Sequence, residues 1–135
     1  MTNRMCPFFF AFLFMISSCE TSHTSRKLII NESGFDCYID YNNAYVDTVF
    51  YLTSGDYLIL SDFTKLGCHP DGLATSPCSI NPSDTITVTV NSILPYSFIG
   101  DFRDEYSWEE TLSGNRATVQ GCSFTLRPEQ IVLNL

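Results

Sequence analysis

The chain has 135 residues, with 15 Asp and Glu against 7 Lys and Arg and a formal net charge of −8. This length is enough for one domain and too short for two of ordinary size. Nucleic-acid binding draws most of its affinity from Lys and Arg that neutralise phosphates, so we expect no nucleic-acid partner for a chain this acidic.

The first 19 residues have the layout of an export signal. Arg4 supplies a positive start, residues 8–16 are an unbroken apolar run, and two serines precede Cys19. A helix that crosses a membrane needs roughly 18 or more apolar residues, and this run has 9. We therefore expect the segment to be cleaved and not to span the membrane permanently.

The end of the signal, Ile-Ser-Ser-Cys at residues 16–19, resembles the bacterial lipobox. The resemblance implies that the thiol of Cys19 receives a diacylglycerol and that Cys19 becomes the acylated first residue of the mature chain. Two or more acyl chains anchor a protein stably to a bilayer, so the membrane is an expected partner. The alternative is an ordinary secretory signal that ends beside a chance cysteine.

This processing defines the expected domains: a signal peptide over residues 1–18, a flexible polar tether over residues 19–26, and one folded domain over residues 27–135. His23 lies in the tether and is expected to be solvated. Removal of the first 18 of 135 residues takes away Arg4 alone among the charged residues, so the net charge falls from −8 to −9. The expected location is the outer membrane, on its periplasmic or its cell-surface face.

Four cysteines are left once Cys6 is removed with the signal and Cys19 is acylated. An even number in an exported chain is typical of a disulfide framework in an oxidising compartment. These four cysteines are Cys37, Cys68, Cys78 and Cys122. They can pair in three ways.

We favour two bridges among these cysteines. Cys68 and Cys78 share one irregular loop, whereas Cys37 and Cys122 lie in apolar, strand-like segments near opposite ends of the domain. A zinc site built from Cys68, His69 and Cys78 is the alternative, but zinc prefers closely paired ligands and no second cluster accompanies this one. We therefore expect disulfides and no metal or other cofactor.

The hydrophobic pattern predicts an all-β fold. Residues 35–41 alternate, with Cys37, Ile39 and Tyr41 on one face, and residues 85–90 are β-branched throughout. Seven or eight short antiparallel strands should form a small β-sandwich, immunoglobulin-like or similar, with one or two short helical turns. The further strand candidates are residues 27–31, 46–53, 57–63, 93–99 and 117–126.

Local signals predict how these strands are connected. Ser-Gly-Asp at residues 54–56 favours a hairpin, and the Gly and Pro residues of 64–83 favour a long loop. Ser107 followed by Glu110 resembles a capping box, so residues 108–113 are expected to form a short helix. The pattern of residues 129–135 fits either a helix or a last strand.

Three motifs lie in the second half of the chain: Ser-Asp-Thr-Ile at residues 83–86, Tyr-Ser-Trp-Glu-Glu at residues 106–110, and Pro-Glu-Gln-Ile at residues 128–131 before Leu133 and Asn134. With the lipobox, they resemble the short uncharacterised lipoproteins of Bacteroides and related Bacteroidales. Those proteins tend to continue further after the final Leu-Asn and lack a loop closed by cysteines. The resemblance implies a lipid-anchored envelope protein and no particular activity.

The sequence contains no catalytic constellation. A nucleophile and base pair needs a positioned histidine, and His69 lies beside an expected disulfide. We therefore expect a non-catalytic binding or structural module of the cell envelope that contacts protein or glycan through Tyr106, Trp108 and His69. A small periplasmic enzyme or enzyme inhibitor is the alternative. Aromatic rings that stack on sugars must be exposed, so a buried Trp108 would count against this surface.

Overall fold

The structure, a computed structural model, describes residues 21–67, 78–114 and 117–135. These residues form nine β-strands and two 3-10 turns, which confirms the expected all-β fold with one or two short helical turns. No helix in these ranges is long and apolar enough to cross a membrane. The elements are β1 (Thr21–Asn31), β2 (Cys37–Asn42), β3 (Asp47–Leu52), β4 (Tyr57–Gly67), β5 (Thr85–Val90), β6 (Tyr96–Phe98), η1 (Glu105–Ser107), β7 (Trp108–Ser113), β8 (Ala117–Leu126), η2 (Pro128–Gln130) and β9 (Ile131–Leu133).

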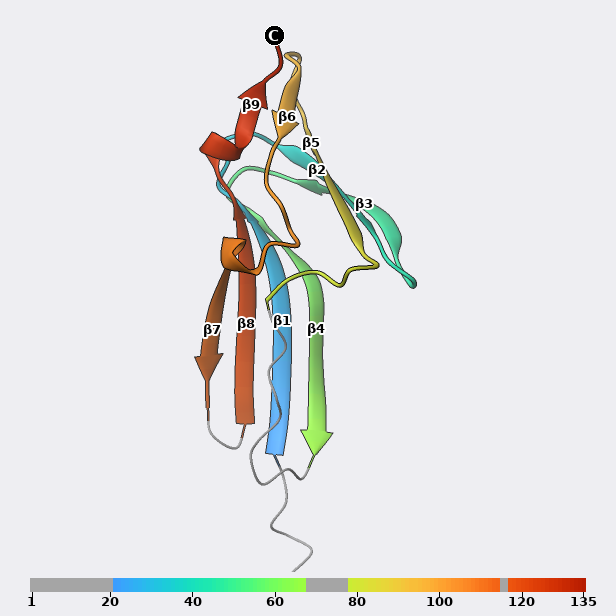
Figure 1. The fold of residues 1–135 in the computed structure, drawn as a ribbon, viewed down its shortest axis with the longest axis vertical. Helices are drawn as coiled ribbons and strands as arrows, with labels where there is room; N and C mark the ends of the chain where they lie inside the picture. The colour runs from blue at the N-terminus through green and yellow to red at the C-terminus, as the bar shows by residue number, and fades with distance from the viewer. Residues whose placement is uncertain (1–20, 68–77, 115–116) are drawn as a thin grey trace, which may run out of the picture.

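The strands form three sheets, in the orders β4-β1-β8-β7, β3-β2-β5 and β6-β9. Strands β1 and β8 pair in parallel, while the other pairings are antiparallel. As a result, β1 and β8 begin, and β4 and β7 end, at the same end of the four-stranded sheet (Figure 1). The β6-β9 pair lies at the opposite end of the molecule (Figure 1).

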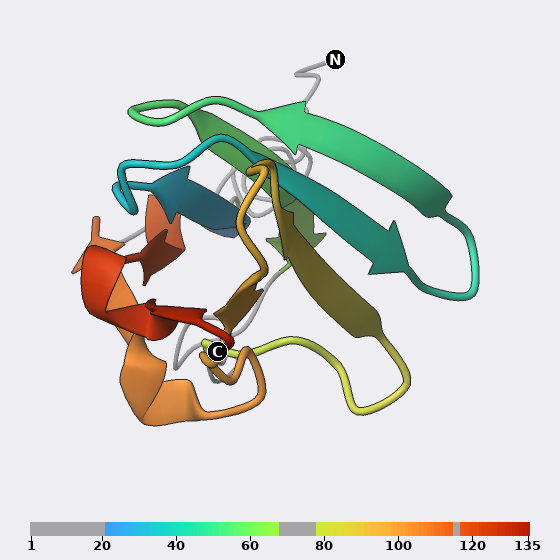
Figure 2. The same cartoon turned by 90° about the horizontal axis from the view of Figure 1, so that it is seen from above.

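The core lies between the inner face of the four-stranded sheet and the β3-β2-β5 sheet (Figure 2). Ile29, Phe124 and Leu126 from the large sheet and Ile39 from β2 are fully buried. Strand β2 alternates buried and exposed residues as the sequence predicts. Trp108 packs edge-on against Phe124 with ring centroids 5.5 Å apart, which joins β7 to the same core.

The start of the domain is a correction to the sequence prediction. Residues 21–26, expected as part of the flexible tether of residues 19–26, form the first half of β1 between β4 and β8. His23 and Ser25 face inward and are 3% and 2% exposed, so His23 is buried and not solvated. The segment lacks the apolar alternation of an ordinary strand. It is extended because its backbone pairs with a strand on each side, and not because apolar side chains are buried along its whole length.

The turn at residues 54–56 does not close a hairpin. It leads from β3 to β4, which belong to different sheets. Gly55 adopts a positive φ of 92° there, and its N–H donates to the Asn31 carbonyl at 2.6 Å. The turn is thereby attached to the end of β1. A turn signal between two strand patterns cannot distinguish a hairpin from a crossing between sheets.

The expected helix over residues 108–113 is also wrong, because this segment is strand β7. Trp108 lies opposite Phe124 of β8, and Ser113 lies opposite Val119. The helical turn precedes it as η1, whose cap is Asp104, the carboxylate of which accepts from the Tyr106 N–H. The C-terminal segment combines the two alternatives that the sequence left open, since η2 is followed by β9.

The disulfide is the largest difference from the sequence prediction. Cys78 bonds to Cys122 with their Cα atoms 5.4 Å apart, which excludes both the Cys68–Cys78 and the Cys37–Cys122 bridges. Cys37 is free and buried in the core. Cys68 lies outside the described residues. Closeness in sequence favoured the wrong partner because the segment that follows Cys78 crosses the inner face of the large sheet, where Cys122 points.

We expect this disulfide to stabilise the fold substantially. It closes a loop with a sequence separation of 44, for which the chain-entropy model gives about 4 kcal/mol. A Cys78→Ala/Cys122→Ala double variant should therefore lose about 4 kcal/mol of unfolding free energy in urea denaturation. Reductant should destabilise the wild type and leave the double variant unchanged. Peptide mapping that joins Cys122 to Cys37 would contradict the assignment.

Candidate ligand pocket

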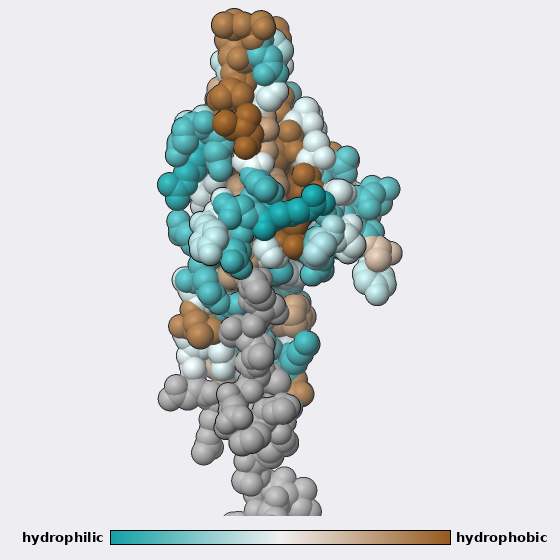
Figure 3. All heavy atoms as spheres, in the orientation of Figure 1, coloured by the Kyte–Doolittle hydropathy of each residue, from teal (hydrophilic) through white to brown (hydrophobic). Residues whose placement is uncertain are grey.

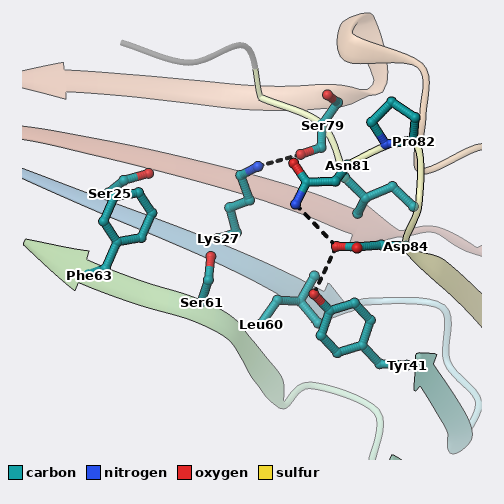
Figure 4. Close-up of a pocket in the computed structure, with 11 residues that line it drawn as sticks. Ser25, Lys27, Tyr41, Leu60, Ser61, Phe63, Ser79, Asn81, Pro82 and Asp84 are labelled. Atoms are coloured by element: carbon teal, nitrogen blue, oxygen red, sulfur yellow. Dashed lines mark hydrogen bonds between the residues drawn. The ribbon is translucent and has the colours of Figure 1, made fainter. Parts of the chain in front are cut away.

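A pocket of about 370 Å³ lies between the inner face of β1 and β4 and the segment that leads into β5 (Figure 4). We call it the Asp84 pocket. It combines polar and apolar walls, and among the described residues that line it, the two with charged side chains are Lys27 and Asp84. Its lining residues are Ser25, Lys27, Tyr41, Leu60, Ser61, Phe63, Ser79, Ile80, Asn81, Pro82 and Asp84.

The backbone and the side chain of Asp84 are both held in place by hydrogen bonds. Asp84 directly precedes β5, and its backbone N–H donates to the Asn81 carbonyl at 3.0 Å, so a tight turn sets its position. The carboxylate is buried, at 6% exposed, and accepts hydrogen bonds from Tyr41 at 3.1 Å, Ser83 at 3.3 Å and Asn81 at 3.5 Å. Three donors hold the negative charge, as a buried carboxylate requires.

Tyr41 reaches the pocket from the inward face of β2. Burial raises the pKa of its phenol, and the hydrogen bond to the negative Asp84 raises it further, while a hydrogen bond from Asn43 at 2.8 Å opposes the shift. The phenol therefore stays protonated, donates a hydrogen bond to Asp84 and does not act as a base. Because Tyr41 and Asp84 come from neighbouring strands of one sheet, the pair also links β2 to the start of β5.

Lys27 enters from the opposite sheet. It lies on the inner face of β1, and its ammonium donates to the Ser79 carbonyl (Figure 4). Burial lowers the pKa of Lys27, and the nearby charge of Asp84 partly offsets this. A positive and a negative group thus face one pocket from two sheets, and the formal charges of its described lining residues cancel.

The chemistry available here is binding through hydrogen bonds and apolar contact. Of the residues that the structure describes, no histidine or cysteine lines the pocket, and Phe63, Leu60 and Pro82 give it apolar walls. Among the described residues, no group of three or more His, Cys, Asp and Glu side chains is placed to hold a metal ion. A second pocket of about 200 Å³, beside Asp101 and Arg103, shares Ile80 and Asp84 with the first.

The sequence-predicted contact surface is not assembled. Trp108 is buried, and its indole N–H donates to the Phe102 carbonyl at 2.9 Å, so its ring serves the core. Tyr106 is 90% exposed on η1 and therefore does not share a surface with Trp108. His69 and Cys19 lie outside the described residues.

A second surface feature is the apolar end formed around β6 and β9. We call it the apolar tip. Aliphatic side chains gather there, visible as brown spheres at the top of the molecule in Figure 3. They are all exposed or partly exposed: Ile93, Leu94, Ile99, Val132, Leu133 and Leu135.

Sequence reasoning missed both features. Lys27, Tyr41 and Asp84 were each assigned to a predicted strand or to its start, and no spacing rule brings residues so distant in sequence together. The one available signal was local: Asn81 and Asp84 flank a Pro-Ser turn before a strand, a place where Asx side chains commonly bond to the turn. The apolar tip carries no periodic pattern.

Comparisons with protein-family models, with curated proteins and with solved structures each find no match to this chain.

The charge pair predicts a measurable titration. Lys27 should titrate below the ordinary lysine value of 10.5, and Asp84→Asn should lower its pKa further because the favourable charge is removed. NMR of labelled lysine side chains can follow the ammonium directly. Asp62→Asn is the matched control, since Asp62 pairs with Arg26 on the outer face at 2.7 Å and should leave Lys27 unchanged.

The same shift fixes the sign of the pH dependence. Between the folded pKa of Lys27 and 10.5, the unfolded chain binds more protons than the folded one, so this group's contribution to stability rises with pH in that window. Below the folded pKa, its burial is a constant cost. An unchanged or raised Lys27 pKa in Asp84→Asn would contradict the described pair.

Proposed function

We propose that this protein is a lipid-anchored component of the bacterial cell envelope whose β-domain is a non-catalytic binding module, and that the Asp84 pocket takes a short, neutral saccharide. The lipobox at residues 16–19 supports the anchor. The bridge between Cys78 and Cys122 supports an oxidising compartment, where structural disulfides persist.

The observation that carries the binding role is the set of groups around Asp84. Sugar hydroxyls both donate and accept hydrogen bonds, and the pocket offers a carboxylate, the Asn81 amide, the Lys27 ammonium and the Ser61 hydroxyl. The Phe63 ring, 42% exposed, provides an apolar surface for the C–H face of a sugar ring. This combination suits a polyhydroxylated ligand better than an apolar one.

Charge and size narrow the ligand further. The chain's net charge of −8 repels anions, and the opposite charges of Lys27 and Asp84 leave the described lining of the pocket without a net formal charge. Small-molecule pockets commonly measure about 300 to 1,000 Å³, and this one, at about 370 Å³, is near the lower end. It fits one or two sugar rings and does not fit a folded protein surface.

The apolar tip favours a second role, contact with an envelope protein. Contiguous apolar patches are uncommon on monomeric soluble proteins and often mark interaction sites. Ile93 and Leu135 are fully exposed there, and Leu94 is half-exposed. A protein contact at the tip is compatible with a saccharide in the pocket, because the two sites share no residue.

Mass spectrometry of the natively expressed protein tests the anchor. We expect an acylated peptide that begins at Cys19, and a Cys19→Ala variant should leave the membrane fraction. Protease treatment of intact cells then distinguishes the cell-surface face from the periplasmic face. A mature N-terminus at another residue, or an unmodified Cys19, would remove the anchor from the proposal.

Binding is tested with the mature lipidated protein in detergent on an array of neutral and charged envelope glycans. Asn81→Ala and Phe63→Ala should each weaken binding of a neutral glycan by about tenfold, the effect of losing roughly 1.4 kcal/mol of contact. Tyr106→Ala is the control, because Tyr106 is exposed on η1 and does not line the pocket.

A loss of binding in Tyr106→Ala, with Asn81→Ala unaffected, would move the site to η1. Binding of anionic glycans alone, or of no glycan at all, would contradict the saccharide assignment. Urea denaturation of each variant separates a lost contact from a lost fold.

A further inference from the structure

The ends of the four strands of the large sheet come together at one end of that sheet, which we call the anchor edge (Figure 1). It consists of the first residues of β1 and β8 and the last residues of β4 and β7. Ser22 lies opposite Leu66 on one side and Ala117 on the other, and Ser113 lies opposite Val119. The ends of β1, β4 and β8 are therefore level, and β7 ends two residues further in along β8.

The chain between the proposed anchor and this edge is very short. Strand β1 begins at Thr21, two residues after Cys19. Two fully extended residues span at most about 7 Å. The headgroup layer of a leaflet is itself roughly 5 to 8 Å thick. With the acyl chains of Cys19 in the bilayer, the anchor edge cannot stand clear of the headgroups.

Exposed apolar side chains lie at this edge. Leu66 is 82% exposed, Leu112 is 59% exposed and Val119 is 46% exposed. They come from three different strands that end or begin here. Such side chains gain free energy when a lipid interface covers them.

The charge distribution agrees with a lipid neighbour. The described residues of these strand ends, 21–25, 63–67, 111–114 and 117–120, contain none of the chain's 15 Asp and Glu residues. Lys65 is the one lysine or arginine in these ranges. Glu20, in the link to Cys19, lies outside the described residues. In a chain this acidic, strand ends whose described residues carry no carboxylate suit contact with anionic headgroups, which would repel carboxylates.

We propose that the anchor edge rests on the phospholipid headgroups, with Leu66, Leu112 and Val119 in the membrane interface, so that the large sheet stands upright on the bilayer. The apolar tip then faces away from the membrane (Figure 1). The proposal rests on the acylation of Cys19 in the proposed function and adds a fixed orientation and a second membrane contact made by the folded domain.

Tryptophan fluorescence in vesicles tests this orientation. The lipidated full-length mature protein is reconstituted into phosphatidylethanolamine and phosphatidylglycerol vesicles whose tails carry bromine near the interface, which quenches tryptophan at short range. A Leu66→Trp variant places the reporter at the anchor edge, and an Ile93→Trp variant places it at the apolar tip. Both positions are exposed, and the native Trp108 is a buried background common to both. Intact mass of the same samples reports acylation at Cys19.

We expect brominated lipid to reduce the added emission of Leu66→Trp and to leave that of Ile93→Trp unchanged. If the samples are acylated and neither reporter is quenched, the edge does not touch lipid and the orientation is overturned, while the anchor stands. Quenching of both reporters would mean that the domain lies flat, which also overturns it. An unacylated Cys19 overturns this proposal together with the anchor of the proposed function.

Discussion

The parallel pairing of β1 with β8 is the constraint on which the rest of the structure depends. Parallel neighbours begin at the same end of a sheet, so this pairing brings residues 21 and 117, far apart in sequence, to one edge. It also places Lys27 directly opposite Cys122. The part of β1 that lines the Asp84 pocket therefore lies beside the Cys78–Cys122 disulfide, which holds the segment between Cys78 and β5 over the sheet. An antiparallel pairing of the same strands would put the starts of β1 and β8 at opposite ends of the sheet, so the anchor edge would not form.

The Asp84 network is one place where the two sheets meet through polar groups. The carboxylate belongs to the small sheet's β5 entry, the phenol to β2, and the ammonium to the large sheet. A buried charge is costly unless its neighbours satisfy it, so a network of this kind constrains how the sheets can pack against each other. The same constraint holds the polar groups of the pocket in place, which would lower the ordering cost of the proposed binding.

The sequence predicted the fold class well and the contacts poorly, and the two outcomes have one cause. Alternation in residues 35–41 and β-branched residues in 85–90 report local burial. Both segments contain strands, and β2 buries the face that the alternation predicts. Partner choice is not local. The Cys78–Cys122 bridge, the crossing at Gly55 and the parallel β1–β8 pair each depend on which distant segment lies alongside, and no periodicity encodes that.

Two errors of secondary structure have more specific reasons. Trp108 and Leu112 have helical spacing, but residues 108–113 pair one by one with β8, and this pairing makes the segment a strand. Residues 21–26 are polar, and their strand exists because β4 and β8 satisfy its backbone on both sides. The candidate pocket was missed for the same reason as the disulfide, since Lys27, Tyr41 and Asp84 meet only in the folded sandwich.

Residues 21–26 are a strand and not a flexible tether, and this changes what the proposed binding module can reach. A flexible link would let an anchored domain search a large volume, whereas a two-residue link to the proposed lipid anchor at Cys19 would hold it at the bilayer. On β1, the pocket residues Ser25 and Lys27 lie four and six residues from Thr21, or roughly 13 and 20 Å along the strand. With the anchor edge on the headgroups, the pocket opens just above them, within reach of saccharides that are held at or near the same membrane. The apolar tip lies beyond the far end of β1, an 11-residue strand of roughly 35 Å, where a protein partner can approach without displacing lipid. In the proposed orientation the two sites are therefore at different heights above the membrane, which would let one small domain join a membrane-proximal glycan to a more distant protein.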